Sequence, residues 1–468
     1  MAEEFDLVVV GGGPGGYAAA LYGAAAGLKV ALVEEQRVGG TCLHRGCIPA
    51  KELLETATVA RTVRGAAEFG IEATGAAHPT VNLATSQTRK QQVIDRLVGG
   101  LEGLLKGRKV TVVPGTGRLV DGAGRLVRVS DGTELRGKHV VLAMGSVPRS
   151  LPLPGFDFDG TRVLSSDHVL NIASVPGRVV VVGGGAIGCE FASFLRDVGS
   201  EVTILEALPQ LLNGVDQQVA QVVARSFQKR GIASQVGVTI HGVDVRGDGV
   251  TVRFDASTGP TSIDADMVIV SVGRRPRSEG TGLLEAGIAI DARGFVPVDA
   301  KMRTSVAGVY AVGDLVNTPQ LAHVAFAEAI VAVRDMLGED VAPIDYAKVP
   351  WGIYCHPEVA FCGLTEDTAK ELGYAVQTSV HRFMGNGRAM IIGDTDGLVK
   401  IVADTTTGVL LGVHICGPWA TELIGEGYLA VNWEATAADL GALIHAHPTL
   451  SELFGESSLA LTGRSLHG

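Results

Sequence analysis

DLVVVGGGPGGYAAALYGAAAGLKVALVEE, residues 6–35, is the stretch that decides the fold of this chain. A continuous apolar run comes first, and such a run is typical of a strand that is buried on both faces. Gly11, Gly13 and Gly16 follow in a GxGxxG spacing, and then come a helix-forming stretch and a second apolar run that ends at Glu34. This order predicts a βαβ unit whose glycine turn lets a pyrophosphate approach the start of the helix.

The same pattern occurs a second time. RVVVVGGGAIGCEFASFLRDVGSEVTILEA, residues 178–207, aligns with the first stretch without a gap and places its glycines at 183, 185 and 188. Its second apolar run ends at Glu206, as the first ends at Glu34. A lone GxGxxG also fits an ordinary glycine-rich turn, but the full order of elements, found twice, favours nucleotide binding. We therefore predict an α/β fold with two Rossmann-like dinucleotide-binding domains, in which Gly183, Gly185 and Gly188 contact the second nucleotide.

The acid at the end of each second strand is expected to accept hydrogen bonds from a ribose. A carboxylate at Glu206 would repel the 2′-phosphate of NADP, and no arginine occurs between Glu206 and Gln217 to attract one. The second unit is therefore expected to bind NAD.

Length and charge limit the class of protein. A chain of 468 residues exceeds one ordinary hydrophobic core, so about three domains are expected. The net charge of -11, with no basic tail, argues against nucleic acid as a partner. The acidic start MAEEFD does not resemble a signal peptide, and no apolar run is long enough to span a membrane, so we expect a cytoplasmic protein.

The segment GGTCLHRGCIPAK, residues 39–51, carries a close pair of cysteines, Cys42 and Cys47, among only 6 in the chain. A zinc site usually needs a second such pair, which the sequence lacks. A redox couple is favoured, and two unreactive packed thiols remain the alternative on spacing alone. In a regular helix the Cα atoms at this spacing lie roughly 8–9 Å apart, which is too far for a disulfide, so a break between the cysteines is expected. Because the pair directly follows the first nucleotide unit, a flavin is expected there.

Taken together, the two glycine units, the cysteine segment, GVYAVGDLV (residues 308–316) and HAHPTLSE (residues 445–452) resemble the dithiol flavoprotein reductases. These are class I of the pyridine nucleotide-disulfide oxidoreductase family, and the resemblance is strongest to its dihydrolipoamide dehydrogenases. It runs nearly from end to end. It implies FAD and NAD as cofactors, and a homodimer held by a C-terminal α+β dimerisation domain. The expected domains are residues 1–149 with 276–345 for FAD, 150–275 for NAD, and 346–468 for dimerisation.

The resemblance also assigns roles to single residues. Cys47 would be the sulfur next to the flavin, and Cys42 would exchange with the substrate. His447 would be the base, oriented by Glu452, which suits a histidine because its imidazole titrates near neutral pH. Lys51 would lie near the flavin and pair with Glu190. The further cofactor contacts implied are Gly115, Asp314 and Ala322 for FAD, and Val238 and Gly273 for NAD.

The implied reaction oxidises dihydrolipoamide to lipoamide and reduces NAD through a Cys42–Cys47 redox disulfide and FAD. The implied partners are lipoyl domains of 2-oxoacid dehydrogenase complexes or the glycine-cleavage carrier protein. The alternatives are a related NAD(P)H-dependent reductase of the mycothione or glutathione type, and a redox-sensing flavoprotein without catalysis. His44, Arg45, Ala50, Met144 and Trp419 depart from the usual pattern of the family, and none of them replaces a catalytic group.

Overall fold

The computed structural model describes residues 2–72 and 79–467, and the chain divides into two compact units. Unit 1 comprises Met1–Leu53, Ala84–Arg149 and Gly273–Tyr346. Unit 2 comprises Leu54–Leu83, Ser150–Val272 and Ala347–Gly468. The first glycine unit lies in unit 1 and the second in unit 2, within a segment that interrupts unit 1 along the sequence.

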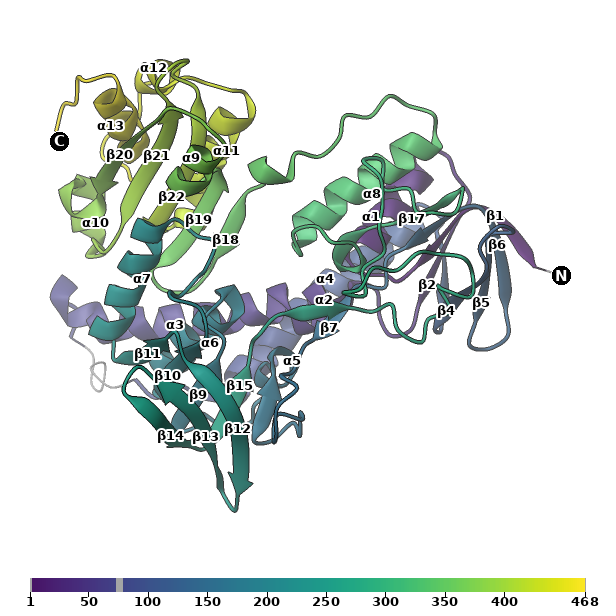
Figure 1. Ribbon diagram of the computed structural model, residues 1–468, viewed down its shortest axis with the longest axis horizontal. Coiled ribbons are helices and arrows are strands. Elements are labelled where there is room, and N and C mark those ends of the chain that lie inside the picture. Colours follow the sequence, from purple (N-terminus) through teal and green to yellow (C-terminus); the bar gives the residue numbers. More distant parts are fainter. Residues whose placement is uncertain (1, 73–78, 468) are drawn as a thin grey trace. The chain divides into compact units, whose positions relative to one another are not determined.

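Unit 1 is built on a largely parallel 7-stranded sheet (Figure 1). Its strands follow the order β3 (Thr111–Pro114), β2 (Val30–Glu34), β1 (Glu3–Val10), β6 (Glu134–Leu142), β5 (Leu126–Val129) and β4 (Gly117–Asp121), with β17 (Val309–Ala311) paired to β6. The helices that pack on this sheet are α1 (Pro14–Ala25), α4 (Leu83–Gly107) and α8 (Ala322–Met336). Strand β1 lies between β2 and β6 and runs parallel to both, so the predicted βαβ unit is confirmed.

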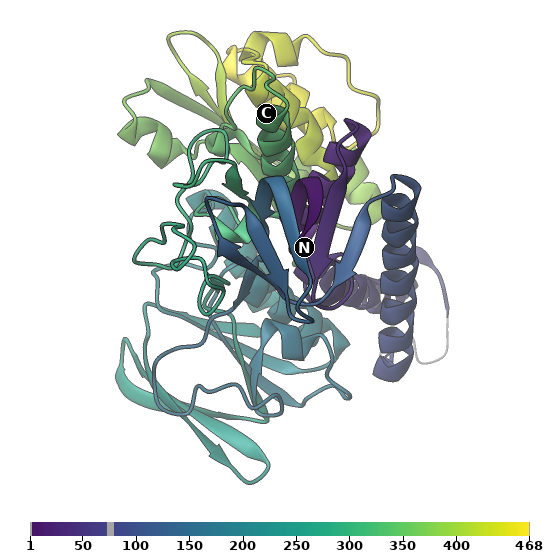
Figure 2. The ribbon, with the colours of Figure 1, turned by 90° about the vertical axis from the view of Figure 1, so that its right-hand side faces the viewer.

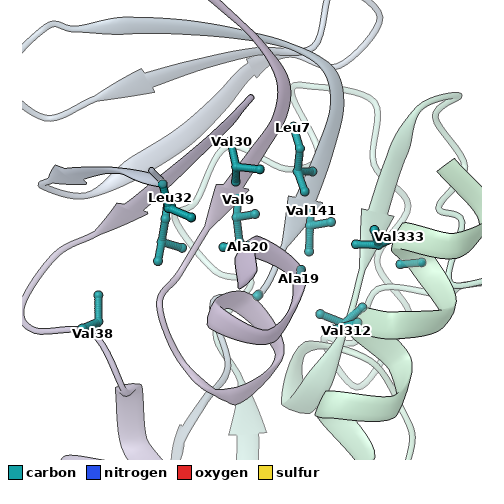
Figure 3. Packing of buried hydrophobic residues seen from close by; sticks show 14 of the residues in the cluster. Leu7, Val9, Ala19, Ala20, Val30, Leu32, Val38, Val141, Val312 and Val333 are labelled. Atoms are coloured by element: carbon teal, nitrogen blue, oxygen red, sulfur yellow. The ribbon is translucent and has the colours of Figure 1, made fainter. Parts of the chain in front are cut away.

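Strand β1 is buried on both faces, as its apolar run predicts. Successive side chains of a strand point to opposite faces. Leu7 and Val9 accordingly join a core with Ala19 and Ala20 of α1 (Figure 3), whereas Val8 belongs to the core on the other side of the sheet. The glycine loop at the end of β1 is therefore anchored in the middle of unit 1.

Unit 2 repeats this arrangement. Its 5-stranded parallel sheet has the order β11 (Ile232–Val236), β10 (Glu201–Glu206), β9 (Arg178–Val182), β15 (Met267–Val270) and β8 (Val163–Ser165). Helix α6 (Ala186–Val198) connects β9 to the parallel strand β10, and α7 (Gln217–Lys229) follows. A 3-stranded antiparallel sheet, β12 (Thr239–Arg246), β13 (Gly249–Ala256) and β14 (Gly259–Ala265), shares a core with β9 and β15 (Figure 2).

The C-terminal part of unit 2 is a separate mixed layer of sheet and helices. Its 5-stranded antiparallel sheet has the order β18 (Trp351–Ile353), β19 (Glu358–Gly363), β22 (Leu410–Gly417), β21 (Leu398–Asp404) and β20 (Val376–Arg382). Helices α11 (Ala420–Asn432), α12 (Ala437–Gly441) and α13 (Glu452–Leu461) supply the other half of its core. The α+β character expected for this part of the chain is confirmed.

The remaining elements are short or connect the larger ones. They are α2 (Gly40–Arg45), α3 (Cys47–Gly65), α5 (Ser166–Val169), α9 (Glu366–Glu371), α10 (Gly387–Ile392), β7 (Ser146–Pro148), β16 (Arg274–Pro276) and the 3-10 turns η1 (Ala66–Phe69), η2 (Gly313–Leu315), η3 (Tyr346–Lys348) and η4 (Phe383–Gly385). Strands β7 and β16 pair where the chain leaves unit 1 and returns to it. Across the described residues, no helix has both the length and the apolar character needed to cross a membrane.

Candidate functional site

The first glycine loop joins β1 to α1, and each of its three glycines has a different task. Gly11 has φ +100°, a conformation that favours glycine. A Cβ on Gly16 would stand 1.7 Å from the Gly11 carbonyl oxygen, so only glycine lets the helix start this close to the strand. A Cβ on Gly13 would meet only the Gly40 Cα, at 3.8 Å, which leaves the loop open at that position.

The second glycine loop has the same design. Gly183 has φ +104°, and a Cβ on Gly188 would stand 1.9 Å from the Gly183 carbonyl oxygen. A Cβ on Gly185 would meet no atom within 4 Å. In both loops the first and third glycines are required by the fold, whereas the middle one keeps space free for a ligand.

Both loops fit the pyrophosphate of a dinucleotide. Helices α1 and α6 start after Gly13 and Gly185 without a side-chain cap, so the N–H groups of their first turns point toward the open space beside the middle glycines. These N–H groups and the positive end of the helix dipole attract an anion. The chemistry of the two loops thus suits FAD and NAD.

The two acids at the strand ends are held in matching positions. Glu34 accepts hydrogen bonds from the Gly12 N–H at 2.7 Å and the Gln36 N–H at 2.9 Å. Glu206 accepts the equivalent bonds from the Gly184 N–H at 2.5 Å and the Leu208 N–H at 2.7 Å. Each carboxylate is thereby fixed beside its glycine loop, where the ribose of a bound nucleotide is expected.

The cysteine segment is fastened to the first glycine loop. The Gly39 N–H donates to the Gly12 carbonyl oxygen at 2.7 Å. Gly40, the first residue of α2, has φ +56°, and a Cβ there would stand 2.5 Å from the Gly13 Cα. The helix that carries Cys42 therefore starts in direct contact with the loop that fits a dinucleotide.

The predicted break between the cysteines is confirmed at Gly46. Cys42 belongs to α2, which ends at Arg45, and Cys47 is the first residue of α3. Gly46 separates the two helices with φ −145° and ψ −113°. Because the helix is interrupted between them, the two cysteines can approach each other in a way that a continuous helix would not allow.

The two sulfurs are within hydrogen-bonding reach of each other. The hydrogen bond to Cys47 and burial both raise the pKa of Cys42, and the nearby Lys51 opposes this rise. Cys47 is the first residue of α3, and the N-terminus of a helix is a position that favours a thiolate. The other four cysteines, Cys189, Cys355, Cys362 and Cys416, are buried in the interior.

Asp314 lies in the turn η2 and has two partners that come from distant parts of the sequence. The Ser146 hydroxyl donates to Asp314 at 2.5 Å, and the Arg274 guanidinium lies 3.8 Å from the same carboxylate oxygen. Arg274 also donates to the Ser146 hydroxyl at 2.7 Å. Of the other residues expected to contact FAD, Gly115 donates its N–H to the Glu34 carbonyl at 2.9 Å, and Ala322 is the first residue of α8.

His447 and Glu452 form the expected pair in unit 2. His447 Nδ1 lies 2.8 Å from Glu452 Oε1, and the Thr449 N–H donates to the other oxygen at 2.8 Å. Burial raises the pKa of Glu452, but the hydrogen bonds from Thr449 and His447 outweigh it and lower the pKa overall. The His447 side chain is 80% exposed, so its Nε2 is available to a reactant.

The remaining predicted residues are distributed over both units. Glu190 is buried in α6 and accepts a hydrogen bond from the Tyr354 N–H at 2.9 Å. Lys51 lies in the first part of α3, in unit 1, so its pairing with Glu190 in unit 2 stays a prediction. Val238 donates its N–H to the Glu206 carbonyl at 3.1 Å, and Gly273 has φ +105° with nothing within 4 Å of a Cβ.

Sequence reasoning missed residues that support the predicted ones. Ser146 and Arg274 hold Asp314, and Glu328 accepts hydrogen bonds from the Gly313 N–H at 2.6 Å and the Tyr346 hydroxyl at 3.0 Å. Glu328 is completely buried, and burial raises its pKa. The sequence offered one signal for Glu328, namely that a glutamate stands in the apolar helix that follows GVYAVGDLV.

Comparisons with known proteins agree with this site. The family model described as pyridine nucleotide-disulphide oxidoreductase matches residues 5–329. The model for the dimerisation domain of the same family matches residues 349–458. Both glycine loops and the cysteine segment lie in the first match, and His447 and Glu452 lie in the second.

Relatives with known names match over nearly their full lengths. A dihydrolipoyl dehydrogenase of Bacillus subtilis is 40% identical and is covered completely, as is this chain. One from Thermus scotoductus is 41% identical over 99% of both chains. Among solved structures, LpdA from Mycobacterium tuberculosis matches with a TM-score of 0.90 and 27% identity, over 98% of this chain and 100% of the other.

Proposed function

Because the chain belongs to the pyridine nucleotide-disulphide oxidoreductase family, we propose that it is a dihydrolipoyl dehydrogenase, which oxidises protein-bound dihydrolipoamide to lipoamide and reduces NAD. The relatives that carry this name match the chain from end to end at about 40% identity. FAD and NAD are the cofactors of this proposal, with FAD at the first glycine loop and NAD at the second.

The observation that carries the proposal is the contact between the cysteine helix and the first glycine loop. Gly40 packs on Gly13, and Gly39 bonds to Gly12, at the point where the pyrophosphate of FAD fits. This contact fixes the cysteine pair next to a nucleotide loop, which is the arrangement that electron transfer between a dithiol and a flavin requires. Two packed thiols without a redox role would not need it.

The roles of the side chains follow from their environments. In the oxidised enzyme a substrate thiolate attacks the Cys42 sulfur, the Cys42–Cys47 bond breaks, and its electron pair stays on Cys47. The second substrate thiol then attacks the substrate sulfur bound to Cys42, which closes the lipoamide disulfide, and Cys42 leaves as a thiol with the proton of that second thiol. His447, held by Glu452, takes the proton from the substrate thiol. A bound FAD would supply the redox chemistry that links the enzyme dithiol to NAD, and the first glycine loop, Glu34 and Asp314 are the groups proposed to hold it.

Lys51 and Glu190 complete the proposed flavin environment. Lys51 lies near the cysteines, where its charge opposes the rise in the pKa of Cys42, and a pairing with Glu190 would restrain its position. Asp314 is the residue proposed for the ribityl chain, because Ser146 and Arg274 already fix its carboxylate.

The proposed partners are a second copy of the chain and a lipoyl protein. The dimerisation-domain match contains large apolar side chains that are highly exposed, including Ile444 at 100%, Trp433 at 78% and Leu443 at 57%. A second copy would bury this surface, which water otherwise contacts at a cost in free energy. Lipoyl domains of 2-oxoacid dehydrogenase complexes, or the glycine-cleavage carrier, would deliver the substrate in the cytoplasm.

A single assay tests the proposed reaction. Purified protein should contain bound FAD and should oxidise NADH with lipoamide at least about tenfold more efficiently than with glutathione or mycothione disulfide. Cys42→Ser should abolish turnover while FAD stays bound. A clear preference for glutathione or mycothione disulfide would establish a reductase of that type. FAD binding without turnover of any of these disulfides would favour a redox-sensing flavoprotein.

A further inference from the structure

An ion pair that joins distant segments involves Glu35, the residue that directly follows Glu34, and Glu34 is the acid expected to hold the ribose of FAD. Glu35 follows Glu34 at the end of β2, and Arg277 follows β16. Arg277 Nη2 donates to Glu35 Oε2 at 2.7 Å, and Nη1 donates to Glu35 Oε1. A guanidinium that contacts both oxygens of a carboxylate forms the strongest and most directional type of ion pair.

The backbone on both sides of this ion pair is also held. The Arg277 N–H donates to the Gly145 carbonyl at 2.9 Å, next to the strand pair β7–β16. On the other side, the Thr116 hydroxyl lies 3.5 Å from Glu35 Oε2. Thr116 follows Gly115, whose N–H donates to the Glu34 carbonyl. The Glu34–Glu35 dipeptide is therefore tied to the glycine loop, to the β3–β4 turn and to Arg277.

The charges explain why the pair should affect nucleotide binding. Two adjacent carboxylates repel each other, and a bound FAD adds a negative pyrophosphate nearby. The hydrogen bond from Arg277 lowers the pKa of Glu35 although burial opposes it, and the charge of Arg45 acts in the same direction. Glu34 contributes to the raised pKa of Arg277, so the field of this guanidinium reaches the carboxylate that is expected to hold the ribose.

We propose that the Glu35–Arg277 pair is a positioning device for the adenosine half of FAD, because it anchors the end of β2 and thereby holds Glu34 in place. This inference rests on the proposed assignment of FAD to the first glycine loop. Neither residue needs to touch the substrate, and the effect should appear in the affinity for FAD rather than in the chemistry at the cysteines.

The test is a double-mutant cycle on FAD affinity, measured by calorimetry on protein stripped of its flavin. Glu35→Gln and Arg277→Gln should each weaken FAD binding about fivefold, and the double variant should bind FAD as each single variant does, because the two groups act as a unit. Arg277→Lys keeps the charge but loses the two-pronged contact, so it should recover only part of the affinity.

A matched control comes from the same unit. Arg128 and Glu134 form an exposed ion pair at 2.9 Å in the β5–β6 hairpin, and Arg128→Gln should leave FAD affinity unchanged. The second glycine loop, which is expected to bind NAD, lies in unit 2, so the affinity for NAD should be unchanged in every variant. An unchanged NAD affinity also shows that the variant is folded. If the variants do not fold without flavin, we would instead heat the variants with FAD bound and measure the temperature at which FAD is released. This temperature should be lower for both single variants than for wild type.

The outcomes separate this inference from the proposed function. Unchanged FAD affinity in both single variants, or losses that add in the double variant, would overturn the role of the pair while leaving the enzyme assignment intact. A wild-type protein that takes up no FAD would overturn the proposed function itself.

Discussion

At the scale of single residues, the two strand-end acids show how a side chain can select a cofactor. Glu34 and Glu206 each accept two backbone hydrogen bonds, so neither carboxylate can turn away from an approaching nucleotide without losing both. A fixed carboxylate discriminates more strongly against a phosphate than a mobile one would, because it cannot relax away from the repulsion. The consequence is sharpest at Glu206, where the diffusible nucleotide NAD is proposed to bind.

We expect NAD to be preferred over NADP by at least about two orders of magnitude in kcat/KM, since each 1.4 kcal/mol of repulsion is worth about tenfold. Glu206→Gln should reduce this preference by removing the charge while keeping a hydrogen-bond acceptor. Glu201→Gln, at the exposed other end of β10, is the control and should leave the preference unchanged. Equal efficiencies with both cofactors in the wild type would show that Glu206 does not face the ribose.

The glycines of the second loop give a prediction with its own control. Gly185→Ala should leave the melting temperature nearly unchanged, because its φ of −74° suits alanine and no atom lies within 4 Å of the added Cβ. It should nevertheless weaken NAD binding by at least about tenfold, since the methyl group occupies the space of the pyrophosphate.

Gly188→Ala should behave in the opposite way. Its Cβ would stand 1.9 Å from the Gly183 oxygen, so α6 would have to shift and the protein should melt at a lower temperature or fail to fold. Thermal denaturation and NAD titration of the two variants check both statements. A Gly185→Ala protein with wild-type NAD affinity would place the pyrophosphate elsewhere.

At the scale of elements, the sequence predicted best what depends on local patterns. The order strand, glycine turn, helix and strand is encoded within thirty or so residues, and both repeats form the expected parallel units. The break between Cys42 and Cys47 was predictable because disulfide geometry excludes a regular helix there. The partners of Asp314 were not predictable, because Ser146 and Arg274 are brought together only by the pairing of β7 with β16.

A buried polar cluster in unit 2 is another feature that sequence patterns do not reveal. Arg61 of α3 and Arg230, just after α7, both pair with Asp197 of α6, and the Arg230 guanidinium also donates to the His356 carbonyl oxygen. Asp394 lies next to this cluster, 3.9 Å from the His356 ring. The cluster joins α3, the helices α6 and α7 and the connection between β18 and β19, so its charge state should affect the stability of unit 2.

The titration of Asp394 predicts whether the free energy of unfolding rises or falls with pH. Burial raises its pKa to about 6, with Asp396 and Glu358 adding to the rise and Arg61 and Arg230 opposing it. The folded pKa lies above the unfolded value of 3.8, so the native state binds the proton more tightly. The free energy of unfolding should therefore fall as the pH rises from about 4 through about 6.

Asp394→Asn removes this dependence and should raise the melting temperature relative to wild type more at pH 8 than at pH 5. Thermal denaturation at the two pH values measures the difference. The exposed Asp248 provides the control, because Asp248→Asn should shift the melting temperature equally at both. If Asp394→Asn instead raised the melting temperature more at pH 5 than at pH 8, the predicted direction of the pH dependence would be wrong.

At the scale of the whole molecule, the side chains proposed for catalysis belong to different units. Cys42 and Cys47 belong to unit 1, whereas His447 and Glu452 belong to unit 2, in the segment that matches the dimerisation domain of the family. His447 is 80% exposed, and Ile444 beside it is completely exposed. We propose that the histidine of one copy serves the cysteine pair of a second copy.

Mixed dimers test whether each active site is shared between two copies. A Cys42→Ser chain and a His447→Gln chain, each nearly inactive alone, are combined and the heterodimer is isolated with two affinity tags. If the histidine of one copy serves the cysteines of the other, one site carries both lesions and the other carries none. Activity should then recover to roughly half of wild type, provided that the two sites act independently. If Cys42 and His447 act within one chain, every site keeps one lesion and the heterodimer is no better than its parents.

The control is a heterodimer of a Glu201→Gln chain and the Cys42→Ser chain. It contains one intact set of groups in either arrangement, so it should show about half of wild-type activity. This value calibrates the recovery that a single working site can give.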